Sequence, residues 1–325
     1  MHYWLDPPST YTNPVKPDLF HDLFHIVTQG TMNEDQTKTL QAWRERLAQT
    51  PKEKHEVRIM TGKTPALACA IDQRFSFTAY IPKCHKFDGP ELPLLVLVHG
   101  ATRNSHMGTM LDFAEECGCV ILAPLFPCGI IALTELHNYR TLVYRGIRFD
   151  QILLSMIEQA SCIWRIRTDK FFLHGFSAGG QFCHRFFYLY PQLLLGVSIG
   201  APGSITLPRK DRPWPEGIAD ITQVFDIKST CGGDHVPNFA AMAKVPLQFV
   251  VGERDIETSA LSDNLGPEVA GGGNRINRIT ALRDAWKEVG INGVLDIVPG
   301  VGHEGGKVTP KVQHFLLPLV KGVSI

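Results

Sequence analysis

The sequence lacks an excess of either charge. Its 32 lysines and arginines balance 32 aspartates and glutamates, so the formal net charge is zero. A chain without a net field has no long-range attraction for nucleic acid or for an anionic membrane surface. The charge balance therefore argues against a nucleic-acid partner.

Long apolar runs are also missing. The most apolar stretch, 120–133, is interrupted by Pro124, Pro127 and Gly129, whereas a membrane-spanning helix needs about 20 consecutive apolar residues. The opening residues 1–8 lack the basic start and apolar centre of a secretion signal. We therefore expect a cytoplasmic protein without a membrane span.

The spacing of the eight cysteines matches neither a compact disulfide framework nor a metal site. Four of them, Cys69, Cys119, Cys162 and Cys183, lie in apolar segments, which is typical of reduced, buried thiols. The run 117–119, Cys-Gly-Cys, lacks the two-residue spacer and the second ligand pair of a zinc site. The sequence predicts no metal and no organic cofactor.

The length and composition indicate one large α/β domain with additions. A chain of 325 residues with 44% hydrophobic content can bury a sizeable core and is not clearly long enough for two domains. Residues 1–55 are predicted to form an N-terminal extension, in which 35–47 has helical apolar spacing. Residues 56–325 are predicted to form the main domain.

Within the main domain, short apolar runs alternate with amphipathic segments. This order predicts a mostly parallel sheet flanked by helices. The predicted strands are Val57–Met60, Phe75–Ile81, Leu92–Val98, Cys119–Phe126, Phe171–His174, Leu195–Ile199, Pro246–Val251 and Val294–Val298. The predicted helices are Met107–Cys117, Phe149–Ile166, Gln181–Tyr190, Ile276–Val289 and a last helix near Pro310–Val320.

A Gly-x-Ser-x-Gly sequence follows one of these strands and opens a predicted helix. It reads Gly175-Phe176-Ser177-Ala178-Gly179. In this context the sequence predicts a nucleophile elbow, a sharp turn that lifts a serine hydroxyl above the sheet while the glycines allow close packing. Ser177 is therefore the candidate nucleophile. The alternative is an ordinary turn serine without chemistry.

A serine nucleophile needs a base, and the base needs an acid that orients it. The strand Pro246–Val251 runs into a loop with three carboxylates. Asp255 best matches the position from which an acid reaches the elbow, and Glu253 and Glu257 stay open as rivals.

The base is predicted in the loop after the last strand, Val294–Val298. There His303 stands in a glycine-rich stretch, 299–306, and completes the chain order serine, acid, histidine. His314, on the predicted terminal helix, is the weaker alternative.

The tetrahedral intermediate of acyl transfer also needs backbone donors for its oxyanion. One donor is expected from the N–H of Ala178, the residue after the nucleophile. The other is expected from the loop that begins at His99, from Ala101 or from its neighbour Thr102. His99 itself is interpreted as a structural residue beneath that loop.

Residues 204–243 interrupt the alternation with several prolines and glycines and are predicted to form a lid insertion. It follows a strand at its carboxyl end, where ligands bind in open α/β sheets. Its aromatic residues Trp214 and Phe225 are candidate substrate contacts, with Ile205, Leu207 and Ile218 beside them, while 209–212 looks like a solvated turn. A packing role for Trp214 and Phe225 is nearly as well supported, because apolar side chains under long loops form satellite clusters.

Taken together, these motifs resemble the α/β-hydrolase superfamily over residues 56–322. The phrases Leu-Val-His-Gly-Ala-Thr-Arg-Asn at 97–104 and His-Gly-Phe-Ser-Ala-Gly-Gly-Gln-Phe at 174–182 are similar to those of intracellular enzymes of the polyhydroxybutyrate-depolymerase and feruloyl-esterase type. Ser-Ile-Gly-Ala-Pro-Gly at 198–203 also resembles that branch. The secretion signal and disulfide pattern of secreted depolymerases are not matched, which argues against polymer degradation.

The triad and the resemblance predict a serine hydrolase that cleaves an ester, thioester or related acyl bond of a small or medium-sized substrate. Two alternatives stay open. The same triad could serve an acyltransferase, a cyclase or a carbon–carbon bond hydrolase, or the fold could carry a binding protein without catalysis.

All eight cysteines are expected to be free thiols, because the sequence shows neither a secretion signal nor a disulfide spacing. Thiol titration of the denatured protein without reductant is expected to give the same value as titration after reduction. Two thiols fewer before reduction would reveal a disulfide and contradict this prediction.

Overall fold

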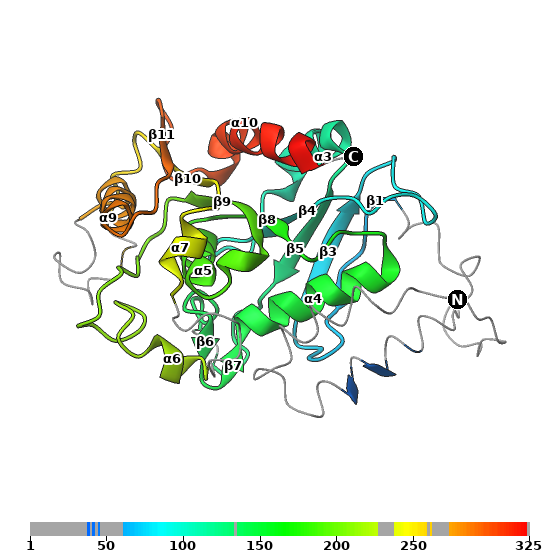
Figure 1. The fold of residues 1–325 in the computed structure, drawn as a ribbon, viewed down its shortest axis with the longest axis horizontal. Coiled ribbons are helices and arrows are strands. Elements are labelled where there is room, and N and C mark those ends of the chain that lie inside the picture. Colours follow the sequence, from blue (N-terminus) through cyan, green and yellow to red (C-terminus); the bar gives the residue numbers. More distant parts are fainter. Residues whose placement is uncertain are drawn as a thin grey trace.

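A computed structural model describes residues 61–132, 135–226, 237–258, 261 and 273–323, together with 38, 39, 41, 42 and 45. These last five are helical, inside the stretch 35–47 that has helical spacing in the sequence. The predicted strand Val57–Met60 and the rest of the extension lie outside the described residues. The described part of the main domain is built on one central sheet (Figure 1).

The sheet has nine strands in the order β1-β3-β5-β4-β8-β9-β10-β11, with β2 paired to β3. From β4 to β11 along this order every pair is parallel, and only β1, β2 and β3 are antiparallel to their neighbours. The prediction of a mostly parallel sheet is thus confirmed. Their bounds are β1 Gly62–Lys63, β2 Leu67–Ala68, β3 Ser76–Ile81, β4 Leu94–Val98, β5 Val120–Leu125, β8 Phe171–Phe176, β9 Leu194–Gly200, β10 Leu247–Gly252 and β11 Val294–Val298.

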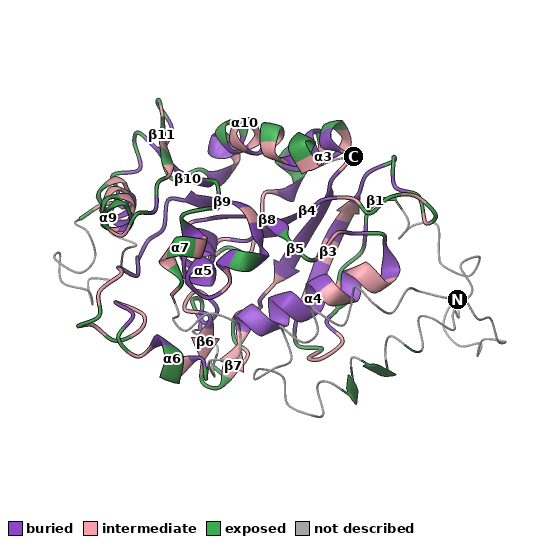
Figure 2. Cartoon of the chain, viewed as in Figure 1, coloured by how far each residue is buried: buried purple, intermediate pink, exposed green. Residues whose placement is uncertain are grey.

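Helices cover both faces of the sheet, so its central strands are buried throughout (Figure 2). In Figure 1, α3 and α10 lie on one side, and α4 and α5 lie on the other. Burial on both faces explains why β4 and β8 read as continuous apolar runs rather than alternating ones. The helices are α3 Leu111–Cys117, α4 Phe149–Ile163, α5 Ala178–Leu189, α6 Ile221–Val224, α7 Phe239–Met242, α9 Arg275–Glu288 and α10 Gly305–Val323, with short 3-10 turns η3 Met107–Met110 and η4 Pro191–Leu193.

The structure adds two details that the sequence did not indicate. A hairpin of β6, Val143–Tyr144, and β7, Ile147–Arg148, precedes α4. The last helix begins at Gly305, five residues before the predicted start at Pro310. Proline is favoured in a first helical turn because it has no N–H to donate, but here Pro310 lies inside the helix.

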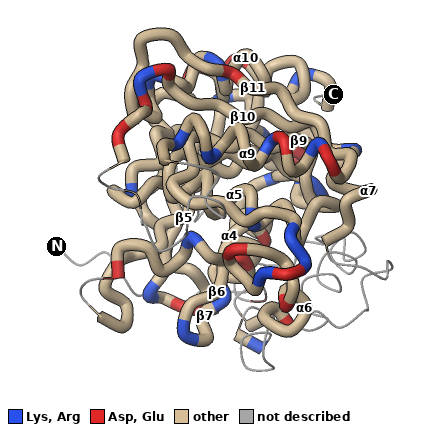
Figure 3. Tube along the Cα trace, turned by 90° about the vertical axis from the view of Figure 1, so that its left-hand side faces the viewer, with Lys and Arg blue, Asp and Glu red and all other residues tan. Residues whose placement is uncertain are grey.

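The distribution of charged residues and the character of the helices agree with the amino-acid composition. Basic and acidic residues are interspersed along the chain (Figure 3). None of the described helices has the length and apolar character needed to cross a bilayer. Among the described residues, no three or more His, Cys, Asp or Glu side chains are grouped to hold a metal ion. The seven cysteines in the described ranges form no disulfide, and Cys231 lies outside those ranges.

The insertion 204–243 is described at 204–226 and 237–243, and these parts contribute no strand to the sheet. Its first residues are tied to α5. Thr206 N–H donates to His184 Nε2 at 3.0 Å, and Tyr188 Oη donates to the Thr206 carbonyl at 2.9 Å. The described part of the insertion thus docks along α5 and not over the residue that precedes this helix.

Trp214 and Phe225 pack against each other, and the expectation that they form a substrate pocket is not met. Their rings meet edge to face at 5.0 Å, and Trp214 Nε1 donates to the Thr141 carbonyl at 2.9 Å. Phe225 is fully buried beneath the Arg148 guanidinium, which lies 4.7 Å from its ring centre. The two rings form the satellite cluster that the sequence left as the alternative.

Replacing Phe225 with alanine is therefore expected to lower the free energy of unfolding by about 3 kcal/mol, because a buried aromatic side chain would leave a cavity. Gln223, exposed on α6 two residues before Phe225, gives the matched control, and Gln223→Ala is expected to change stability by less than about 0.5 kcal/mol. Urea denaturation followed by circular dichroism measures both. Equal stability of the two variants would contradict the packing role.

Candidate active site

The predicted elbow is a tight turn between β8 and α5. Ser177 has φ 59° and ψ −117°, a strained backbone conformation for a residue with a side chain. Its N–H donates to the Gly200 carbonyl at 2.9 Å, and its carbonyl accepts from Gln181 N–H at 3.0 Å. A Cβ on Gly175 would lie 2.5 Å from the carbonyl carbon of Gly179, and a Cβ on Gly179 would lie 2.3 Å from the carbonyl oxygen of Val98. Both glycines are therefore needed for the helix to fold back on the sheet.

The register of the parallel strands places this turn at the centre of one sheet edge. Gly175 pairs with Val98 on one side and with Ile199 on the other. On the far side of β9, Gly252 of β10 pairs with Val298 of β11. The loops after β4, β8, β10 and β11 therefore leave the sheet at the same edge.

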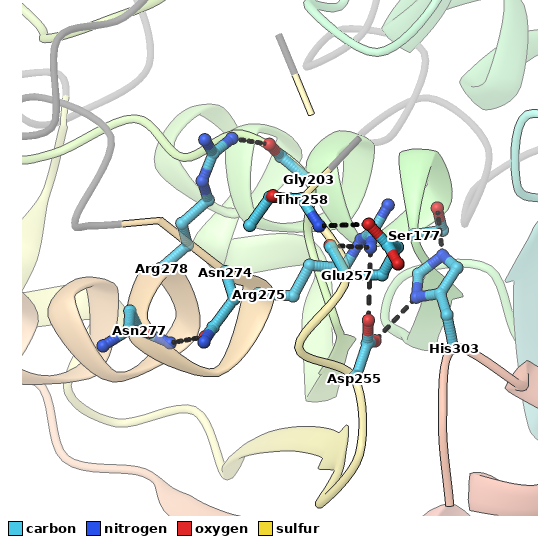
Figure 4. Close-up of polar contacts among 10 residues, drawn as sticks. All are labelled: Ser177, Gly203, Asp255, Glu257, Thr258, Asn274, Arg275, Asn277, Arg278 and His303. Atoms are coloured by element: carbon cyan, nitrogen blue, oxygen red, sulfur yellow. Dashed lines mark hydrogen bonds and ion pairs between the residues drawn. The ribbon is translucent and has the colours of Figure 1, made fainter. Parts of the chain in front are cut away.

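Three side chains from three of these loops form one hydrogen-bonded chain (Figure 4). Ser177 Oγ lies 2.9 Å from His303 Nε2, and His303 Nδ1 lies 2.6 Å from Asp255 Oδ2. Asp255 is 1% exposed, and the ring of Phe176 lies 4.8 Å from that of His303. The structure thus brings together the three residues that the sequence selected from separate segments.

The rival residues make other contacts. Glu253 Oε2 accepts from the Gly300 N–H at 2.8 Å, so this carboxylate supports the turn that leads to His303. Glu257 Oε1 accepts from the N–H of its neighbour Thr258 at 3.0 Å. His314 is exposed on α10.

The loop after β4 lies against the elbow and presents unused backbone donors. A Cβ on Gly100 would be 3.7 Å from Ser177 Cβ. No hydrogen bond to another described residue engages the N–H of Ala101, Thr102 or Ala178, and all three residues line the same cleft. Free N–H groups beside a serine hydroxyl are suited to bind a developing negative charge on oxygen.

Buried polar groups hold that loop in place. His99, 1% exposed, accepts from the Phe126 N–H at Nε2, which leaves Nδ1 to donate to the Gly100 carbonyl at 2.8 Å. Burial lowers the pKa of His99 to about 4, so the ring is neutral at pH 7 and structural, as interpreted from the sequence. Arg103, which the sequence reasoning missed, donates from Nη1 to the carbonyls of Ala101 and Leu136 at 2.6 and 2.7 Å.

The cleft above Ser177 has a volume of about 540 Å³. Its walls come from the loop after β4, the elbow, Gly203, the segment around Arg140 and residues 303–307. Trp214 and Phe225 are not among its lining residues, in agreement with their packing role. From the expected lid, the described residues 204–226 and 237–243 contribute none either.

Solved structures with a similar arrangement of strands and helices include esterases and other hydrolases. A poly(3-hydroxybutyrate) depolymerase from Bordetella parapertussis aligns with a TM-score of 0.59 and 22% identity over 75% of this chain and 84% of its own. Poly(aspartic acid) hydrolase-1 from Sphingomonas sp. KT-1 aligns with a TM-score of 0.58 and 19% identity over 74% of this chain and 92% of its own. A ferulic acid esterase aligns with a TM-score of 0.54 and 14% identity over 81% of this chain and 99% of its own. No protein-family model and no curated protein matches the chain.

The chain has the α/β-hydrolase fold. This agrees with the resemblance inferred from the motifs around His99 and Ser177, and at these identities the likeness concerns the fold alone. The function of a protein with this fold depends on the geometry of its own site.

One feature of the site had no sequence signal, the ion pair between Arg275 and Asp255. Arg275 is the first residue of α9 and lies close to Asp255 and His303 in Figure 4. Its Nη1 is 3.2 Å from Asp255 Oδ1 and also donates to the Glu257 carbonyl at 3.3 Å. Both partners are buried, so Arg275 places a positive charge beside an interior carboxylate whose other oxygen binds His303.

Arg275→Met is expected to lower the free energy of unfolding by about 3 kcal/mol, because it leaves the buried Asp255 carboxylate without its cation. Arg283→Met removes a solvent-exposed ion pair with Asp284 from the same helix and is the matched control, expected to change stability by less than about 1 kcal/mol. Chemical denaturation compares the two. Equal effects would show that the buried pair does not stabilise the fold.

Proposed function

We propose that this protein is a serine hydrolase that cleaves an ester, thioester or related acyl bond of a small or medium-sized substrate through an acyl-enzyme. The observation that carries the proposal is the chain of hydrogen bonds from Ser177 Oγ through His303 to Asp255. The names of the similar structures, a depolymerase of a polyester and a ferulic acid esterase, support ester bonds as the substrate class. We also propose a cytoplasmic location, from the sequence.

In the first half of the reaction, Ser177 Oγ attacks the substrate carbonyl carbon while His303 Nε2 takes the hydroxyl proton. Asp255 accepts the Nδ1–H of His303, which fixes the tautomer and stabilises the imidazolium that forms. The negative charge on the carbonyl oxygen is received by the N–H of Ala178 and by that of Ala101 or its neighbour Thr102. The intermediate collapses, and His303 protonates the leaving alcohol or thiol.

In the second half, water replaces the leaving group. His303 Nε2 removes a proton from the water as it attacks the acyl carbon of the Ser177 ester. The second tetrahedral intermediate collapses to the free acid, and the proton returns to Ser177 Oγ. No metal or organic cofactor is needed for either half, because the protein's own groups supply nucleophile, base and oxyanion donors.

Ser177→Ala is expected to lower kcat at least about 10⁴-fold, and His303→Ala is expected to be equally damaging, because the triad acts as a unit. Asp255→Asn is expected to be severe but milder, since the acid orients the base rather than transferring a proton. The measurements are hydrolysis of 4-nitrophenyl acyl esters of increasing chain length and covalent labelling by a fluorophosphonate probe.

Glu253→Gln and Glu257→Gln serve as matched controls and are expected to keep activity within about tenfold of the parent. A crippled Glu257→Gln beside an active Asp255→Asn would reassign the acid. Near-normal hydrolysis by Ser177→Ala would remove the serine mechanism. Label from ¹⁸O-water that fails to enter the acid product would show that acyl transfer replaces hydrolysis.

A further inference from the structure

One wall of the cleft carries several N–H groups that have no hydrogen-bond acceptor among the described residues. Gln181 stands one helical turn after Ser177 and is 4% exposed. Its Oε1 accepts from Ser204 Oγ at 2.7 Å, whereas its Nε2 has no acceptor among the described residues. A primary amide anchored through its oxygen presents both N–H groups to the space beside it.

Gly203 leaves that space open. A Cβ at Gly203 would lie 3.1 Å from Gln181 Nε2 and 4.0 Å from Arg275 Nε. Arg275 Nε is buried and has no hydrogen-bond partner within the described part of the chain, although its Nη1 binds Asp255. Two unpaired N–H donors thus approach one position that only a glycine at 203 keeps free, and all three residues line the cleft above Ser177.

Arg140 adds a full positive charge to the same cleft. Its side chain is partly buried, yet it makes no hydrogen bond or ion pair among the described residues. Burial lowers the pKa of Arg140, and no carboxylate of the described residues opposes the effect. The unpaired guanidinium of a half-buried arginine is suited to a planar anion, which it can bind through two parallel hydrogen bonds.

A buried arginine in the interior behind the cleft positions these donors. Arg185 is 1% exposed and donates from Nη1 to the Arg140 carbonyl at 2.9 Å. Its Nη2 donates to Ser204 Oγ at 3.2 Å, and this hydroxyl in turn binds Gln181 Oε1. Arg185 therefore fixes both the backbone of Arg140 and the amide of Gln181 without a carboxylate of its own.

The charges around this wall favour an anion. Burial, followed by the charge of Arg140, lowers the pKa of Arg185 to about 9, so both guanidinium groups are positive at pH 7. The cleft-lining carboxylate, Glu304, is paired with Lys307 at 2.7 Å. Asp255 is already engaged by its histidine and Arg275. An anionic ligand would supply the negative charge that the described residues do not.

We propose that Arg140, Gln181 and Gly203 form a subsite for a carboxylate carried by the substrate, beside the carbonyl that Ser177 attacks, with Arg275 contributing its charge. This inference rests on the proposed function and narrows it to acyl compounds with a second, anionic end. Residues four apart on a helix lie on the order of 6 Å apart, so the carboxylate sits a few bonds from the attacked carbonyl. Monoesters of short dicarboxylic acids have this form.

The test compares two 4-nitrophenyl esters that differ at the far end of the acyl chain, 4-nitrophenyl hydrogen glutarate with a free carboxylate and 4-nitrophenyl methyl glutarate with a neutral methyl ester, after subtraction of uncatalysed hydrolysis. The parent protein is expected to show a kcat/KM at least about tenfold higher for the anionic ester, as one or two charge-assisted hydrogen bonds imply. Arg140→Gln is expected to bring the ratio close to one. Gly203→Ala, whose methyl group fills the space, is expected to lower it as well.

Lys307→Gln is the matched control, because it also removes one positive charge from the cleft lining but one that is already paired with Glu304. It is expected to leave the ratio within about twofold of the parent. A parent ratio of one or less would overturn the subsite. So would an equal fall of the ratio in Lys307→Gln and Arg140→Gln, which would indicate a diffuse field instead of a built site.

Binding to the Ser177→Ala protein separates this inference from the proposed function. Isothermal titration with monomethyl glutarate and dimethyl glutarate needs no chemistry, and the monoanion is expected to bind at least about tenfold more tightly. The difference in affinity is expected to vanish when Arg140→Gln is added to this protein. The melting temperature checks that the double variant is folded. If it is unstable, Gly203→Ala in the same background tests the same point. Absence of hydrolysis with this binding preference intact would remove the serine hydrolase alone, whereas equal binding of both compounds would remove the subsite.

Discussion

Parallel pairing of the central strands is the constraint on which the site depends. Because β4, β8, β9, β10 and β11 run in one direction, each sends its following loop out at the same edge of the sheet. Residues as far apart in sequence as Ser177 and His303 then need only short loops to meet at 2.9 Å. The burial of β8 on both faces makes the platform rigid, so the strained turn at Ser177 is held by its surroundings.

Electrostatics is the second organising factor of the cleft. The buried carboxylate of Asp255 has two partners, the His303 ring and the Arg275 guanidinium, so neither of its oxygens is left without a contact in the interior. The other side of the cleft shows the opposite situation. Arg140 and Arg185 are positive and have no carboxylate partner among the described residues. A site with a satisfied acid and unsatisfied cations is suited to a substrate that brings its own negative charge.

Much of the fold was predictable because burial leaves a periodic trace. The predicted strands at 75–81 and 294–298 match β3 and β11 within one residue, since each is bounded by turn residues and rich in β-branched or aromatic side chains. The hairpin β6-β7 left no such trace in the sequence, because a strand of two residues is too short to show an alternation of apolar and polar side chains. The start of α10 was missed because Pro310 looks the same at a first turn and inside a helix.

By itself the sequence determined the chemistry-bearing residues of the proposed triad and their loops, because a nucleophile elbow needs its glycines close to the serine and chain order then limits the partners. Only the tertiary structure decided what the long-range contacts do. From the sequence, a pocket role and a packing role were nearly equally well supported for Trp214 and Phe225. In the structure their rings pack against each other, and neither lines the cleft above Ser177. Arg275 and Arg140 carry no local signal, since the effect of a charge depends on the groups that surround it in space, and those groups come from segments far apart in the chain.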